Sequence, residues 1–76
     1  MSDFDLPSMQ RTLQSYQNDA SLLLPDRLAE RLQALKFVSL LHELARTQRQ
    51  QPAWMTLQQS AQQLAKQCTA ANRALF

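Results

Sequence analysis

The absence of glycine is the feature of this 76-residue chain that most restricts its fold. Glycine is the usual residue where a turn needs a positive φ, so a chain without it rarely forms tight hairpins or phosphate-binding loops. The three prolines, at positions 7, 25 and 52, divide the chain into segments of helical length. Because proline is accepted in the first helical turn and disrupts the interior, each one marks a boundary. The sequence therefore predicts an all-α protein.

Three helices are expected, over residues 8–21, 25–50 and 53–75, within a single domain at 8–76 that follows a flexible lead at 1–7. Ser8 is a candidate cap for the first helix, and Pro25 is suited to the first position of the second. The third helix is expected to start near Thr56, which begins a capping-box pattern, or one turn earlier at Pro52. The last two helices are expected to form a long antiparallel hairpin, with the short first helix beside them.

The third segment has the most regular apolar pattern in the chain. Its apolar residues recur at alternating intervals of four and three, which is typical of a helix–helix seam. We expect this seam to pack along the second helix, and an intermolecular seam is the alternative. Its members are Leu57, Ala61, Leu64, Cys68, Ala71 and Leu75.

The second segment has two apolar faces. Leu28, Leu32 and Leu35 lie within about 60° of one another around the helix axis, at 100° per residue. Later in the segment, polar side chains occupy this same side of the helix. A helix of this kind must meet two partners, which are provided either by a three-helix bundle or by a dimer. We favour the dimer, because a chain of this length has a thin core. The other face carries Ala34, Phe37, Leu41, Leu44 and Ala45.

Residues with catalytic chemistry are few and scattered. His42 falls on a polar helix side, and Cys68 lies within the apolar seam, where a thiol acts as a small hydrophobe. One histidine and one cysteine provide too few ligands for a zinc site, and no base accompanies the thiol. We therefore expect no enzyme, no catalytic or metal site, no cofactor and no small-molecule substrate.

The distribution of charge and hydropathy bears on location and partners. Residues 1–26 carry a net charge of −3 and residues 27–76 a net charge of +5. No apolar run approaches the roughly 18 residues that span a bilayer, and the first residues lack the basic and apolar regions of a secretory signal. We expect a cytoplasmic protein without a membrane partner, whose basic half could face an acidic one.

Five apolar residues are the candidates for a partner or dimer interface, because they lie on the second face of the middle helix or at the tip of the hairpin. Trp54 has two interpretations: it is an exposed binding anchor, or it folds back to cap the core, which we favour slightly. The five are Phe37, Leu41, Leu44, Trp54 and Met55.

A loosely basic strip on the second helix is the candidate contact for nucleic acid or for an acidic protein. The strip consists of Arg31, His42, Arg46 and Arg49. Neither the glycine-containing turn nor the polar recognition helix of a helix-turn-helix reader is present. Nucleic-acid binding is thus less favoured than protein binding.

The sequence favours a small regulatory or chaperone-like helical interaction module that acts as a homodimer or through a larger protein whose surface it masks or stabilises. In size and helicity the chain is similar to small bacterial secretion co-chaperones, anti-activators and phage-type regulators, although it shares no motif with them. A small DNA-binding transcriptional regulator that uses the basic strip is the alternative.

Overall fold

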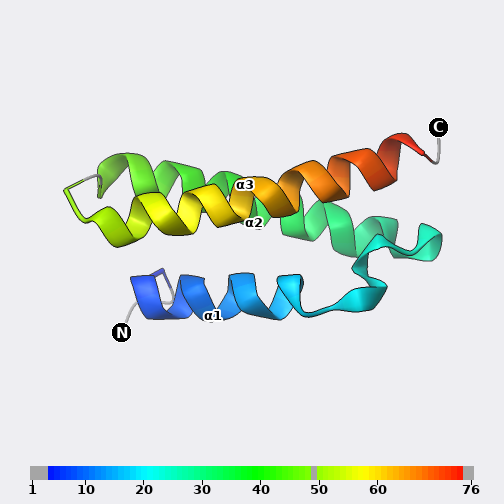
Figure 1. Cartoon of the computed structure of the whole chain (residues 1–76), viewed down its shortest axis with the longest axis horizontal. Coiled ribbons are helices and arrows are strands. Elements are labelled where there is room, and N and C mark those ends of the chain that lie inside the picture. Colours follow the sequence, from blue (N-terminus) through cyan, green and yellow to red (C-terminus); the bar gives the residue numbers. More distant parts are fainter. Residues whose placement is uncertain (1–3, 49, 75–76) are drawn as a thin grey trace.

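The all-α prediction is confirmed. The computed structural model describes residues 4–48 and 50–74, and no strand occurs within these ranges. Helix α1 spans Leu6–Gln17, and two short 3₁₀ turns follow it, η1 at Ala20–Leu23 and η2 at Pro25–Arg27. Helix α2 spans Leu28–Thr47 and helix α3 spans Pro52–Arg73. Figure 1 shows α2 and α3 running side by side as a hairpin, with α1 along one side of it.

Helix α1 begins earlier than the sequence predicted. Asp5, rather than Ser8, is its N-cap, and the Asp5 carboxylate accepts a hydrogen bond of 3.0 Å from the backbone N–H of Ser8. These bonds with Ser8 lower the pKa of the Asp5 carboxyl, because they favour its charged form. Pro7 then lies in the first turn, where its missing N–H costs nothing. The expected lead at 1–7 is therefore too long: residues 6 and 7 are helical, and residues 1–3 lie outside the described range.

The connection between α1 and α2 is a pair of 3₁₀ turns, where the sequence predicted α-helix up to residue 21 and from residue 25. Asp19 caps η1 by accepting hydrogen bonds from the backbone N–H and the hydroxyl of Ser21, and these bonds lower the pKa of the Asp19 carboxyl. Leu24 is extended, with ψ of 149°, as a residue before proline should be. Pro25 thus opens a single 3₁₀ turn, and α2 starts three residues later.

The start of α3 matches the earlier of the two expected positions. The helix begins at Pro52 with Gln51 as its N-cap residue. Thr56 lies inside the helix, where its hydroxyl donates to the Pro52 carbonyl at 3.4 Å. The capping-box interpretation of Thr56 is therefore wrong, because Pro52 already provides a preorganised first residue.

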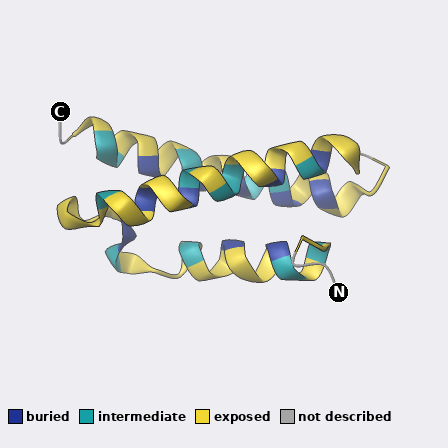
Figure 2. Ribbon diagram, turned by 180° about the vertical axis from the view of Figure 1, so that it is seen from behind, coloured by how far each residue is buried: buried dark blue, intermediate teal, exposed yellow. Residues whose placement is uncertain are grey.

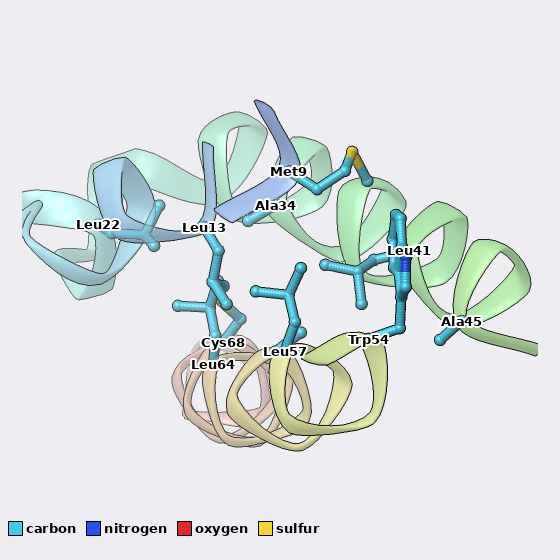
Figure 3. Close-up of a cluster of buried hydrophobic side chains, with 11 residues drawn as sticks. Met9, Leu13, Leu22, Ala34, Leu41, Ala45, Trp54, Leu57, Leu64 and Cys68 are labelled. Atoms are coloured by element: carbon cyan, nitrogen blue, oxygen red, sulfur yellow. The ribbon is translucent and has the colours of Figure 1, made fainter. Parts of the chain in front are cut away.

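The predicted hairpin seam is confirmed, and it forms the core. Leu57, Ala61, Leu64 and Cys68 are all buried on one side of α3. Met9 and Leu13 of α1 and Leu22 of η1 cover this layer from one side, as the buried positions in Figure 2 and the side chains in Figure 3 show. Leu75, the last residue of the predicted seam, lies outside the described ranges.

Arg31 is a fully buried cation that joins three parts of the chain. Its Nη1 donates to the backbone carbonyls of Leu22 at 2.9 Å and Leu24 at 2.5 Å. Its Nε donates to the side-chain oxygen of Asn72 at 2.5 Å. The described partners of the guanidinium are thus neutral oxygens, and Nη2 has no hydrogen-bond partner among the described residues. Arg31 therefore holds the 3₁₀ connection and the end of α3 against α2.

Candidate partner-binding groove

Most of the apolar residues predicted for an interface are used inside the chain. Leu41 is 0% exposed and belongs to the core, so its prediction as a surface contact is wrong. Phe37 and Leu44 are half-buried and pack against the core. The ring of Phe37 lies 5.6 Å from that of Tyr16 in α1, at 44° between planes. This face of α2 is thus covered within the chain, by the core residues of α3 and, at Phe37, by Tyr16 of α1.

Trp54 and its neighbour Met55 have opposite environments. Trp54 is 4% exposed and lies within the core cluster, which confirms the capping interpretation and excludes Trp54 as an exposed anchor. Figure 3 shows its ring beside Leu41. Met55 is 42% exposed, because the next residue of a helix points about 100° away from the one before it. Met55 alone of the five candidates remains an exposed apolar side chain.

The predicted basic strip is shorter than expected. Arg31 is buried, so its inclusion in a surface strip is wrong: helix periodicity placed it near an edge, and the 3₁₀ connection covers that edge. His42 and Arg46 are exposed, and Arg46 forms an ion pair of 3.4 Å with Glu43. Arg49 lies outside the described residues.

A line of hollows follows the hairpin where α1 does not cover it. The hollow nearest the tip lies between Ala45 and Arg46 of α2 and Met55 of α3. The next shares Gln58 with it, and the third shares Gln62 with the second. We call this line the open groove, and its lining residues are Val38, Ser39, His42, Glu43, Ala45, Arg46, Met55, Gln58, Gln62, Ala65, Lys66, Thr69, Ala70 and Arg73.

The open groove and α1 lie on different flanks of the hairpin. Ser60 lines a hollow beside α1, whereas Gln62 lines the open groove. Side chains two positions apart in an α-helix point in directions about 200° apart. The same separation holds in α2 between Phe37, which faces α1, and Ser39, which lines the groove. Each helix of the hairpin thus offers one flank to α1 and another to solvent.

The early leucines of α2 continue the open groove toward the other end of the hairpin. Leu28, Leu32 and Leu35 lead into Ser39, His42 and Arg46 at alternating intervals of four and three, so all six share one stripe of the helix. Leu32 is 48% exposed, and Leu28 and Leu35 are half-buried. The first apolar face of α2 is therefore covered only in part within the described residues, with Leu32 its exposed member.

The polar contacts across the open groove are few. The side chains of Gln58 and His42 meet through Nε2 and Nδ1, which links α3 to α2 near the middle of the groove. Lys66 and Arg73 lie on the α3 side and Arg46 on the α2 side, while Glu43 is the single carboxylate among the lining residues. The leucine stripe of α2 continues from one end of the groove, and the cations among the lining residues outnumber the carboxylate.

Sequence reasoning missed the α3 side of this groove. The apolar residues of that helix predicted its buried seam, and no surface beside the seam was predicted. The signal that could have found the groove is a second set of positions in α3, spaced by three and four, that runs beside the seam. This set is Met55, Gln58, Gln62, Ala65 and Thr69.

The remaining reactive groups do not form a site. Cys68 is buried and not disulfide-bonded, and burial raises the pKa of its thiol, which keeps it in the protonated, unreactive form. No cluster of three or more metal-ligating side chains occurs among the described residues. Within the same ranges, none of the helices combines the length and hydropathy needed to cross a bilayer.

Comparison with models of protein families, with curated proteins and with solved structures found no match for this chain.

Proposed function

We propose that the protein is a non-enzymatic helical interaction module that binds a helical segment of a larger protein in the open groove. A groove between two antiparallel helices accepts a third helix through interdigitating side chains, and α1 occupies the opposite groove in this way. The carrying observation is Leu32 in the leucine stripe of α2, which is 48% exposed although the other apolar face of the helix is packed within the chain. Binding there would mask or stabilise the partner helix, and we expect this to occur in the cytoplasm.

The proposal replaces the surface expected from the sequence with another. A partner cannot use Leu41 or Trp54 without unfolding the core, whereas Leu32 and Met55 are accessible in the folded chain. A dimer that paired through Phe37 would have to displace α1 first. Binding through the open groove needs no such change.

Nucleic-acid binding is less well supported than protein binding. The predicted strip loses Arg31 to the core, and Arg46 is paired with Glu43, whose carboxylate would repel phosphate. Phosphate contacts weaken steeply with salt, while apolar groove contacts persist. Binding that disappears at a few hundred millimolar salt would favour the nucleic-acid alternative.

We expect the Leu32→Glu variant to lose its partner, because a buried carboxylate would replace an apolar contact at the centre of the leucine stripe. The loss of affinity should be at least about tenfold, given the roughly 1.5–3 kcal/mol that burial of a leucine contributes. Affinity purification of the tagged protein from its native cells, with quantitative mass spectrometry, measures this loss.

The matched control for that experiment is Leu23→Glu. Leu23 is 45% exposed, close to the value for Leu32, but it belongs to η1 and lies outside the leucine stripe of α2 that continues the open groove. Both variants should remain folded by circular dichroism. Equal recovery of the same partner with Leu32→Glu and the unmodified protein would contradict the proposal.

A further inference from the structure

We infer that the partner segment is an acidic amphipathic helix, with a leucine-rich stripe flanked by glutamate or aspartate. This inference rests on the proposed function and specifies the chemistry of what the open groove binds. Three observations carry it: the length of the groove, its apolar stripe, and the sign of the charges on its two edges.

The groove is long enough for a helix of about five turns. Along α3 it extends from Met55 to Arg73, and eighteen residues at 1.5 Å per residue span about 27 Å. Isolated helices of this length are only marginally stable in water, so the partner segment would gain much of its order from binding. A folded helix of a larger protein would also fit.

The apolar contacts are concentrated toward one end of the groove. Ala65 and Ala70 line the α3 side there. Leu28, Leu32 and Leu35 lie on the stripe of α2 that continues from Ser39, His42 and Arg46 toward this end. The small alanine side chains allow a second backbone to approach closely. The apolar stripe of the occupant would thus pack between the two helices, and its large residues would contact the leucines.

The edges of the groove are positively charged. Lys66 and Arg73 line it on α3, and Arg46 lines it on α2. Lys36 follows Leu32 by one turn of α2 and so lies beside the leucine stripe that continues the groove. Among the described residues of these edges, Glu43 carries the one negative charge, and it forms an ion pair with Arg46. Residues flanking the apolar stripe of a bound helix would lie beside these four cations, so acidic residues at those positions are favoured and basic ones are repelled.

The same charges disfavour a second copy of this chain as the occupant. Two open grooves that faced each other would bring the cations on the edges of one copy against those of the other. Like charges in juxtaposition across an interface cost free energy, and there is one carboxylate per copy to offset them. The groove is therefore better matched to a different protein.

Selection from a library of displayed helices tests the inference. The probe is an 18-residue helix with leucine fixed along one stripe and the flanking positions randomised among Glu, Gln and Lys. Selected sequences should be rich in Glu at the flanks. Synthetic peptides with Glu flanks should bind about tenfold more tightly than those with Lys flanks, since four surface pairs of about 0.3–0.5 kcal/mol each add to this ratio.

Charge-reversed proteins provide the matched comparison. The double variant Lys66→Glu, Arg73→Glu should prefer Lys-flanked peptides to Glu-flanked ones. The double variant Arg11→Glu, Arg27→Glu has the same change in net charge, but both residues lie outside the open groove. It should keep the preference for Glu-flanked peptides.

The outcomes separate this inference from the proposed function. Peptides whose binding requires Leu32, but whose flanks are neutral or basic, would overturn the acidic partner and leave the groove as a helix-binding site. Selection of no helix, or of helices that bind the Leu32→Glu variant equally well, would overturn both.

Discussion

Replacing Arg31 by alanine is expected to remove most of the free energy of unfolding at 25 °C. The substitution removes three hydrogen bonds that join α2 to the 3₁₀ connection and to Asn72. The backbone carbonyls of Leu22 and Leu24 then lose the donor that Arg31 provides. Hydrogen bonds from a charged group contribute about 1.5–3 kcal/mol each, and the cost of burying the guanidinium offsets part of their sum. A net loss of about 3 kcal/mol is comparable to the whole stability of about 3–5 kcal/mol that a core of this size supplies.

Urea denaturation followed by circular dichroism measures this loss. Arg27→Ala is the control, because Arg27 is exposed and its ion pair with Glu30 lies at the surface, so its removal should change the free energy of unfolding by less than about 0.5 kcal/mol. Arg31→Met tests the cause, since it keeps the packing volume and removes the donors. If Arg31→Met were as stable as the unmodified protein, the buried hydrogen bonds would not hold the connection in place.

Replacing Trp54 by alanine is expected to lower the free energy of unfolding by about 3–5 kcal/mol. Trp54 is buried at the tip of the hairpin together with Leu41 and Ala45, and its truncation leaves a cavity because the surrounding structure relaxes only in part. Thermal denaturation should show a large decrease in Tm or no cooperative transition. The tryptophan fluorescence of the unmodified protein should be blue-shifted, as expected for a buried indole.

Met55→Ala is the adjacent control for this prediction. Because Met55 is exposed, its truncation should cost less than about 1 kcal/mol, although it removes an apolar contact from the open groove. Similar losses for the two variants, or fluorescence near that of free tryptophan, would show that Trp54 is not part of the core.

The sequence was sufficient to predict the fold class, the number of α-helices and the seam of the hairpin. The spacing of Leu57, Ala61, Leu64 and Cys68 is a local property that a straight helix converts directly into a buried stripe. The ends of the helices were less accurate. Whether Asp5 or Ser8 caps α1 depends on which side chain reaches a free N–H, and both residue types are suited to that position.

The site was predictable only in part, because burial depends on which helix lies beside which face. The two apolar faces of α2 were correctly recognised, but nothing in their composition indicates which one α1 covers. The buried Arg31 could not be predicted either, since its acceptors are backbone carbonyls of Leu22 and Leu24 that become available only in the 3₁₀ connection. Intrinsic patterns thus identified candidate surfaces, and tertiary packing selected among them.

The central claim is that the open groove, and not the face beside α1, binds a helix. Its most direct test is a heteronuclear NMR titration of the labelled protein with an 18-residue leucine-rich helix flanked by glutamates. We expect the largest changes in amide chemical shift at Leu32, Leu35, Gln62 and Thr69. The amides of Gln14 in α1 and of Ser60, which faces α1, should be unaffected. Shift changes centred on Gln14 and Ser60, or no change at saturating peptide, would contradict the claim.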